Sequence, residues 1–343
     1  MSAKNFHRFV KPPSGGSKET VTPHLYVSGV GDSLKTPIEL IHAIFEPYGE
    51  LDNEQPWGAI DYPEGRRYVF VSYKNKEDSE KALKMLKDAC YKVDGHWMPD
   101  LPGSSPEEDT IMFNYLIKSD SLQFDQWKVY PTSTVPWTKI KKWYDEGKYI
   151  PYTEKNPESL INVLLDMKKK VPPWIRLNRV VRDIPNTAID GTKYIYAGNK
   201  VTNLRQVLHS RLEKNDEFCR CIRCREVKKN VSLVKYARCV VRKYMSSGSL
   251  EYFISIESGN NKDSYFNYLE GKWYNNYKEE PGIIYGFLRL RLPNRDLYYK
   301  NKHFPELYGS ALIRELHVYG QVAYTNNKND NKKAQHLGFG REL

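Results

Sequence analysis

Cysteine is scarce in this 343-residue chain, and what there is does not suggest disulfides. Three of the five cysteines fall within six positions, and the full set is Cys90, Cys219, Cys221, Cys224 and Cys239. An odd, clustered set argues against a disulfide framework and favours a reducing compartment. We therefore expect a cytoplasmic protein, with the nucleus as the alternative.

Long hydrophobic runs and leader segments are also lacking. No apolar run is long enough to predict a membrane-spanning helix. The first sixteen residues carry Lys4, Arg8 and Lys11 but no apolar core of a signal peptide. Residues 1–22 are rich in Lys, Pro, Gly and Ser, which predicts a disordered tail. We expect no membrane partner.

Acidic residues are outnumbered, with 42 Asp and Glu against 53 Lys and Arg and a formal net charge of +11. Residues 191–250 hold 14 of the basic and only 4 of the acidic residues, so a net charge of +10 lies in one segment. Concentrated positive charge attracts polyanions, which makes RNA the expected partner. A solvated basic face on helices is the alternative interpretation.

Residues 23–90 show the order strand, helix, strand, helix. The strands are predicted at Leu25–Val30 and Tyr68–Tyr73, and the helices at Ile38–Tyr48 and Asp78–Leu86. The two strands resemble the ribonucleoprotein motifs of the RNA-recognition fold, an α/β sandwich. On that resemblance, three strand aromatics would stack on single-stranded bases, namely Tyr26, Tyr68 and Phe70. Ordinary core aromatics, or a protein-binding variant of the fold, are the alternatives.

Residues 91–190 alternate strands with helices, which predicts parallel βα units. Strands are expected at Tyr91–Met98, Trp127–Tyr130 and Ile175–Val181. Helices are expected to start at Ser105-Pro106, Trp137 and Asn156-Pro157. Three strands are too few to close an eight-stranded barrel, so this block is either a small open sheet or the end of a larger barrel.

The last block changes pattern again. A basic amphipathic helix is predicted at Val231–Met245. Strands are predicted at Tyr252–Ile256, Ile283–Leu292 and Ala311–Tyr319, and a long polar loop at Gly259–Glu280.

Residues 91–343 carry a collinear series of stretches that resembles the catalytic subunit of elongator. They are His96–Ser104, Lys128–Thr132, Val171–Arg176, Arg179–Pro185, Asn203–Arg205, Cys219–Val227, Gly286–Arg291, Arg314–Gly320 and Gln335–Arg341. That family joins a radical-SAM domain to a GNAT-type acetyltransferase domain and modifies the wobble uridine of tRNA. The resemblance implies an α/β multidomain chain. Its parts would be the C-terminal part of a radical-SAM βα barrel (91–190), a basic, Cys-rich, tRNA-facing linker (191–230) and the N-terminal part of a GNAT domain (231–343).

Two departures from the family pattern limit the activity that this resemblance implies. The CxxxCxxC motif that holds the family's iron–sulfur cluster is not in the sequence, so we expect neither the cluster nor SAM. The acetyl-CoA contacts implied are His317, Val318, Gln335, Gly338, Gly340 and Arg341, of which Gln335, Gly338 and Gly340 form a Q-x-x-G-x-G pyrophosphate loop. Leu343 falls in the first turn of the helix after that loop, so we expect a truncated fold and assign no catalytic residue.

The C-x-C-x-x-C spacing of Cys219, Cys221 and Cys224 predicts a zinc site. It resembles a zinc site that lies between the two domains in archaeal and bacterial relatives. Cys239 or a water would be the fourth ligand. Three reduced thiols, kept ionised by neighbouring arginines, are the alternative.

The basic segment corresponds to the tRNA-facing part of the family. We expect phosphate contacts from Lys193, Lys200, Arg205, Arg211, Arg220, Arg223, Lys228 and Lys229. The sequence thus favours a tRNA-binding, catalytically incomplete relative of elongator. The alternatives are an active uridine-modifying acetyltransferase completed by a partner chain, and a structural or decoy subunit of an elongator-like complex.

Overall fold

The computed structural model describes residues 24–28, 59–61, 67–72, 76–182, 184–188, 191–227, 233–258, 265–267, 272–274, 282–294, 307, 309–320 and 339–343. The tail expected at 1–22 and the helix expected at Ile38–Tyr48 lie outside these residues. Among the described residues, no helix has both the length and the apolar character needed to cross a membrane.

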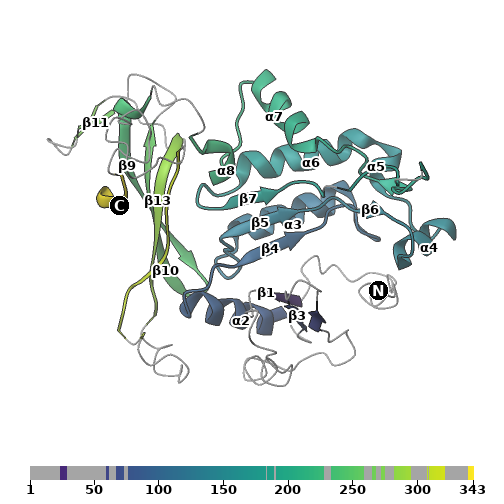
Figure 1. The fold of residues 1–343 in the computed structure, drawn as a ribbon, viewed down its shortest axis with the longest axis horizontal. Helices are drawn as coiled ribbons and strands as arrows, with labels where there is room; N and C mark the ends of the chain where they lie inside the picture. Colours follow the sequence, from purple (N-terminus) through teal and green to yellow (C-terminus); the bar gives the residue numbers. More distant parts are fainter. Residues whose placement is uncertain are drawn as a thin grey trace.

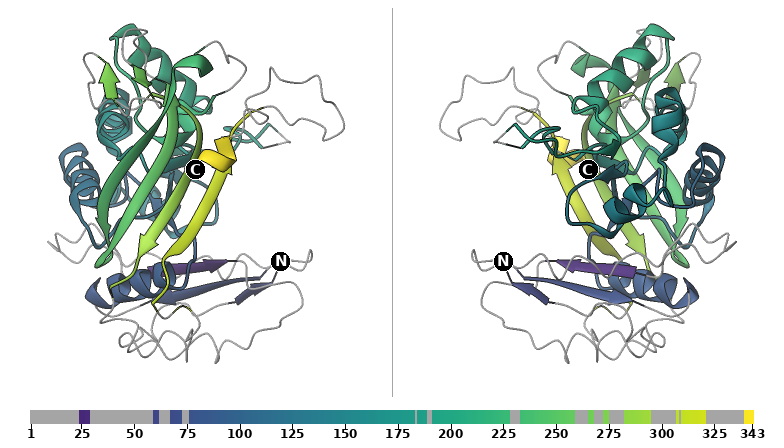
Figure 2. Two further views of the ribbon diagram at one scale, coloured as in Figure 1. Left: turned by 90° about the vertical axis from the view of Figure 1, so that its left-hand side faces the viewer. Right: turned by 90° about the vertical axis from the view of Figure 1, so that its right-hand side faces the viewer.

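The N-terminal part is a three-stranded antiparallel sheet followed by a helix. Strands β1 (His24–Ser28), β2 (Ala59–Asp61) and β3 (Arg67–Ser72) lie in the order β1-β3-β2. Helix α2 (Lys76–Asp88) follows, and this small sheet lies beside it (Figures 1 and 2). The strands and the second helix predicted here are confirmed.

The middle part is a parallel sheet with helices on one face. Its strands are β4 (Asp94–Trp97), β5 (Gln126–Val129) and β7 (Arg176–Arg179), in the order β4-β5-β7. Helices α3 (Pro106–Lys118) and α6 (Pro157–Lys170) supply core side chains that pack in one cluster with those of the strands. The prediction of parallel βα units is confirmed.

Local sequence explains where these helices start. The Ser105 hydroxyl accepts a hydrogen bond from the Glu108 backbone N–H at 3.2 Å, and Pro106 takes the first helical position. The Asn156 side chain caps α6 in the same way. Each cap uses a backbone N–H that the helix itself leaves without a partner.

Shorter elements surround this sheet. Strands β6 (Ser133–Thr134) and β8 (Ala197–Gly198) pair antiparallel. The helices are α4 (Lys139–Asp145), α5 (Tyr152–Lys155), α7 (Leu204–Lys214) and α8 (Ile222–Arg225).

The C-terminal part is a four-stranded antiparallel sheet that stands beside the parallel one (Figure 1). Its strands are β9 (Ala237–Ser246), β10 (Ser249–Ser258), β13 (Ile283–Leu292) and β14 (Leu312–Val318), in the order β14-β13-β10-β9. Short strands β11 (Tyr265–Asn267) and β12 (Lys272–Tyr274) pair within the segment expected to be a loop. Helix α10 (Phe339–Glu342) ends the chain.

The helix predicted at Val231–Met245 is wrong. A short 3₁₀ turn, η3 (Val234–Tyr236), leads into β9, which pairs with β10 along its whole length. Ser247 and Gly248 join the two strands, and both have positive φ, 46° and 70°. This is the backbone conformation of a tight two-residue hairpin turn, so pairing with β10 outweighed the helical spacing of the apolar residues.

Candidate functional site

Three cysteine sulfurs come together where the chain passes from α7 to α8. The Sγ atoms of Cys219, Cys221 and Cys224 all lie within 4.8 Å of one another. Cys219 and Cys221 are buried, and Cys224 is partly buried. Backbone hydrogen bonds hold this loop against the parallel sheet, including one from the Ile222 N–H to the Ile175 carbonyl oxygen at 3.0 Å.

Two cations lie against this sulfur cluster. The buried Lys168 ammonium donates to Cys224 Sγ at 3.5 Å, and Arg205 Nη1 donates to the same sulfur at 3.8 Å. Hydrogen bonds from Cys219 and Cys221, together with the nearby Lys168 charge, hold the pKa of Cys224 far below its usual range. Burial raises the pKa of the other two thiols. The cluster therefore already stabilises one thiolate.

The donor set fits a thiophilic metal ion. Zinc binds thiolates in a tetrahedron, and the described residues offer three of the four ligands. Cys239 is not one of them, because it lies on β9 and packs in a cluster with Ile256 and Tyr285. Lys168 and Arg205 offset the negative charge that three thiolates would bring to a buried position.

The parallel sheet has one apolar face and one polar face. Trp97, Trp127 and Leu177 point into the core with α3 and α6. The alternate positions on the other face are polar, and they are Asp94, His96, Gln126, Lys128, Arg176 and Asn178. Parallel sheets usually bury both faces, so a polar face is suited to a polar ligand or partner.

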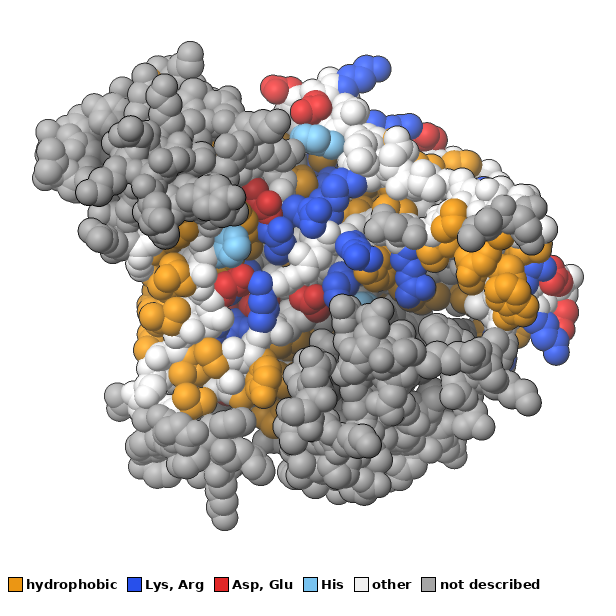
Figure 3. Space-filling model, viewed as in Figure 1, with side chains coloured by type: hydrophobic (Ala, Val, Ile, Leu, Met, Phe, Trp, Pro, Cys, Tyr) orange, Lys and Arg blue, Asp and Glu red, His pale blue; other side chains and the backbone are white. Residues whose placement is uncertain are grey.

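Arginines gather at the carboxyl end of β7, beside this polar face. Arg179, Arg182 and Arg223 are exposed. Arg223 Nη1 donates to the carbonyl oxygen of Asn178 at 3.0 Å, which ties α8 to the end of β7. The Arg182 guanidinium lies 5.2 Å from the centre of the Tyr130 ring. Lys and Arg side chains, interspersed with Asp and Glu, lie on the surface where β4, β5 and β7 run (Figure 3).

The residues predicted to contact phosphates lie in different environments in the structure. Lys193 and Arg223 are exposed. Arg211 forms two hydrogen bonds with the Glu158 carboxylate, and Lys200 lies 3.7 Å from Glu154. Arg205 supports the sulfur cluster, and its Nη2 also donates to the Leu177 carbonyl oxygen.

Two of the residues predicted to contact phosphates lie outside the described part of the chain, and the backbone of a third is hydrogen-bonded within the fold. Lys228 and Lys229 lie outside the described residues. The Arg220 backbone N–H donates to the Lys168 carbonyl oxygen at 3.2 Å. Arg179 and Arg182 were not singled out from the sequence, although the Arg-Val-Val-Arg stretch at the end of the strand predicted at Ile175–Val181 is a signal that could have found them.

Part of the predicted acetyl-CoA set comes together at the end of β14. A Cβ placed on Gly340 would lie 3.6 Å from Val318 Cγ2, so α10 packs against that strand. His317 is exposed next to Val318. Gln335 and Gly338 lie outside the described residues, and the Arg341 side chain is not described.

The register of the N-terminal sheet aligns the predicted base-stacking positions. Tyr26 lies opposite Phe70, and Ser28 lies opposite Tyr68. Because Tyr68 and Phe70 are two residues apart on β3, all three aromatic positions share one face of the sheet.

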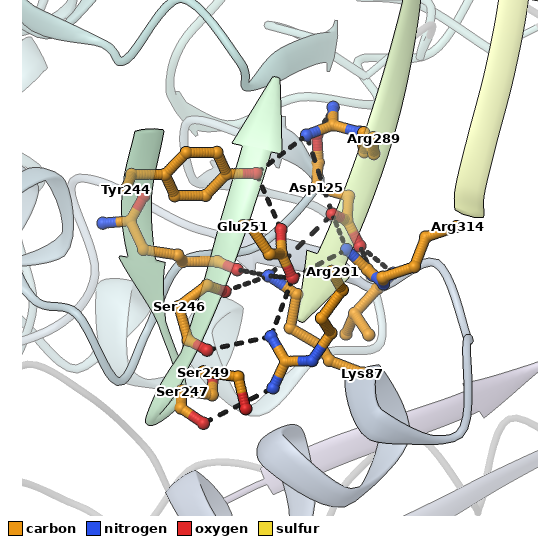
Figure 4. A network of polar contacts seen from close by, with 12 residues as sticks. Lys87, Asp125, Tyr244, Ser246, Ser247, Ser249, Glu251, Arg289, Arg291 and Arg314 are labelled. Atoms are coloured by element: carbon orange, nitrogen blue, oxygen red, sulfur yellow. Dashed lines mark hydrogen bonds and ion pairs between the residues drawn. The ribbon is translucent and has the colours of Figure 1, made fainter. Parts of the chain in front are cut away.

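A buried network of charges joins the parallel sheet to the antiparallel sheet (Figure 4). Asp125, directly before β5, pairs with Arg314 on β14 at 2.5 Å, and Glu251 on β10 pairs with Arg291 at 2.8 Å. Lys87 on α2 lies 3.2 Å from Glu251. All five side chains are almost fully buried.

The network shifts the pKa values of its own members. Burial alone would raise the pKa of Asp125, but the charges of Arg314 and Lys87 hold it well below its usual range. Burial lowers the pKa of Lys87 to about 8, against the opposing effect of Asp125 and Glu251. The spacing of residues along the sequence gave no signal for this network, because its five members come from five separate parts of the chain.

Comparison with known proteins agrees with this geometry. A family model described as the Radical_SAM C-terminal domain matches residues 124–214. The tRNA uridine(34) acetyltransferase of Dehalococcoides mccartyi is 35% identical over 274 residues, which are 78% of this chain and 51% of that protein. Elongator complex protein 3 of Schizosaccharomyces pombe is 31% identical over 77% of this chain and 43% of its own length.

A solved structure agrees as well. The Elp3 of the archaeon Methanocaldococcus infernus, with residues 1–46 deleted, superposes with a TM-score of 0.59. It is 32% identical, over 79% of this chain and 57% of the archaeal one. This chain is a relative of the elongator catalytic subunit. The resemblance inferred from the sequence is confirmed.

The relationship has a defined extent. The chain spans about half the length of the curated relatives it matches. The radical-SAM-like α/β part of the predicted fold class is confirmed. The RNA-recognition and GNAT assignments stay predictions.

Proposed function

We propose that this relative of elongator binds tRNA along the polar face of the β4-β5-β7 sheet and the arginines at its carboxyl end. One observation carries the proposal: Arg179, Arg182 and Arg223 lie exposed where β7 ends, next to a sheet face that is polar along all three strands. Ligands of open α/β sheets bind at the carboxyl ends of the strands. Phosphates are the polar groups that a cluster of exposed guanidiniums binds best.

This function needs neither an iron–sulfur cluster nor acetyl transfer by this chain. The chain would hold its RNA while another protein carries out the chemistry. The sulfur cluster would hold zinc through Cys219, Cys221 and Cys224. Bound there, the ion would stabilise the loop that carries Arg223, because a structural zinc contributes folding energy.

A salt titration tests the proposal. Binding of tRNA would be followed by fluorescence anisotropy at several salt concentrations, for the wild type and for a variant with Arg179, Arg182 and Arg223 changed to Glu. Each lost phosphate contact lowers the slope of log K against log salt by roughly 0.7–0.9. We expect the slope to fall by about two to three and the affinity to fall with it.

Arg211→Glu is the matched control, because Arg211 is a surface arginine already engaged by Glu158. It should change the slope by less than the triple variant does. Equal tRNA binding by the wild type and the triple variant at all salt concentrations would refute the proposal.

A second candidate is acetyl transfer to a tRNA uridine. It is favoured by the packing of Gly340 against Val318, which places the start of α10 at the end of β14. His317, Val318, Gly340 and Arg341 would then contribute to an acetyl-CoA site. Hydrolysis of acetyl-CoA that is stimulated by tRNA, and lost in Gly340→Trp, would support this candidate. For partners, the candidates are subunits of an elongator-type complex, because one relative is named Elongator complex protein 3.

The N-terminal sheet would add a second RNA contact. We propose that the shared face of Tyr26, Tyr68 and Phe70 stacks on unpaired bases, as in an RNA-recognition fold. A variant with all three changed to Ala should lose affinity for single-stranded RNA and keep its salt slope, because stacking releases no counterions.

A further inference from the structure

An exposed tryptophan lies on the part of the molecule formed by β6, β8 and α4, here called the lobe. The proposed tRNA surface does not include this lobe. Trp137 lies between β6 and α4 and is 70% exposed, the highest exposure among the large hydrophobic side chains described. Its φ is +62°, a left-handed backbone conformation that is unfavourable for a bulky residue. Strained residues of this kind persist where the surrounding structure holds them, and they are frequent at functional sites.

The turn around Trp137 is held on both sides. The Thr138 hydroxyl donates to the Val135 carbonyl oxygen at 2.7 Å and accepts from the Lys141 N–H at 3.2 Å. These bonds hold the backbone before and after the tryptophan. The indole is therefore presented to solvent by an ordered turn.

The β6-β8 pair places a second aromatic ring on the same lobe. The Tyr196 N–H donates to the Thr134 carbonyl oxygen at 2.8 Å, three residues before Trp137. Gly198 has a φ of +83°, and a Cβ there would collide with the Thr132 carbonyl oxygen. Only glycine permits this close approach, which keeps Tyr196 beside the loop of Trp137.

Lysines lie against two rings near Trp137, those of Tyr196 and the buried Trp143. Lys141 Nζ lies 4.1 Å and Lys193 Nζ 5.5 Å from the centre of the Tyr196 ring, and Lys139 Nζ lies 5.3 Å from that of Trp143. Lys141 is also held by Asp145, so Lys193 and Lys139 supply the lobe's positive charge. Figure 3 shows hydrophobic side chains gathered over β6 and α4, with charged side chains at their edge.

We propose that Trp137 is a stacking site for a single-stranded RNA base, with Lys139 and Lys193 contacting the adjacent phosphates. An exposed aromatic face beside lysines is how proteins bind single strands without reading their sequence. The neighbouring charge favours RNA over an apolar protein partner. This inference rests on the proposed tRNA binding and adds to it a contact with a loop or an end, where bases are unstacked.

The test compares two RNAs and three proteins. The RNAs are a hairpin with a single-stranded loop and a blunt duplex with the same stem. The proteins are the wild type, Trp137→Ala and Trp137→Phe, with circular dichroism as the check on folding. Trp137→Ala should bind the hairpin about 5- to 150-fold more weakly, which is the loss of one base–aromatic stack. Trp137→Phe should recover most of the affinity, and binding of the duplex should not change.

Fluorescence gives an independent reading. Adding the hairpin should quench emission in the wild type and do so less in Trp137→Phe, because a stacked base quenches the indole beneath it. Tyr91→Ala is the control for hairpin binding, because it removes an exposed aromatic side chain that lies outside the proposed site, on the loop before β4.

The outcomes are distinguishable. Unchanged hairpin binding by Trp137→Ala, as expected if this tryptophan contacts a protein, overturns the inference and leaves the tRNA proposal standing. Equal weakening for hairpin and duplex also overturns it, because a duplex offers no free base. Failure of the wild type to bind the hairpin overturns the inference, whereas failure to bind tRNA in the same assay overturns the tRNA proposal itself.

Discussion

The Arg314 guanidinium donates two hydrogen bonds to the Asp125 carboxylate, from Nη1 to Oδ1 at 2.9 Å and from Nη2 to Oδ2 at 2.5 Å, although the two residues lie 189 positions apart. The pair joins the antiparallel sheet to the parallel one, and both side chains are almost fully buried. Two-pronged pairs of this type are strong and fix orientation. The two sheets are therefore held in one arrangement by charge as well as by apolar contact.

Asp125→Asn should destabilise the fold by about 3–5 kcal/mol, because it leaves buried arginines without their counter-charge. Urea unfolding followed by circular dichroism would measure this. Lys170→Met, which removes the half-exposed partner of Asp166, is the control and should cost less than about 1 kcal/mol. Similar losses of stability for both variants would show that the buried ion pair contributes no more than a half-exposed one.

Stability should fall in acid through Glu257. Burial would raise the pKa of Glu257, but Arg225 and Arg242 lower it to about 2. The unfolded chain therefore binds more protons between pH 4.5 and pH 2, so the contribution is full above pH 4.5 and is lost as the pH falls toward 2. We expect it to reach about 3 kcal/mol.

Glu257→Gln is the variant that isolates this effect. The difference between its free energy of unfolding and that of the wild type should become smaller as the pH falls from 4.5 toward 2. A constant difference would mean that Glu257 does not titrate with a lowered pKa.

Metal content should depend on the sulfur cluster. Purified wild-type protein should carry zinc, and Cys224→Ser should lose it, because one of three thiolate ligands is gone. Elemental analysis by mass spectrometry gives the ratio of zinc to protein. Cys239→Ser, a change outside the cluster, should keep its metal, and equal loss in both variants would argue against the assignment.

The start of α3 offers a test of the local sequence argument. Ser105→Ala removes the hydroxyl that accepts from the Glu108 N–H and should cost about 1 kcal/mol. Thermal unfolding would show it as a lower Tm. Ser210→Ala, at an exposed position inside α7, should leave stability unchanged or raise it slightly, since alanine favours helix interiors.

How much the sequence could predict depended on how far apart the interacting residues are. Ser105 and Asn156 marked two helix starts correctly, because a cap bonds to a backbone N–H only a few positions away. The three cysteines were recognised for the same reason, since C-x-C-x-x-C keeps their sulfurs close in almost any compact turn. The Val231–Met245 segment misled, because its spacing suits a helix and only its partner strand β10 decides otherwise.

The sequence by itself determined the family, the helix caps, the cysteine cluster and the excess of positive charge. The tertiary structure alone decided which of those charges face outward: it engaged Arg205 at the sulfur cluster and Arg211 with Glu158, and left Arg223 exposed beside Arg179. It also decided that Asp125 and Arg314 meet. The physical reason is that a charge is stabilised by what surrounds it after folding, and those neighbours come from parts of the chain that no local pattern connects.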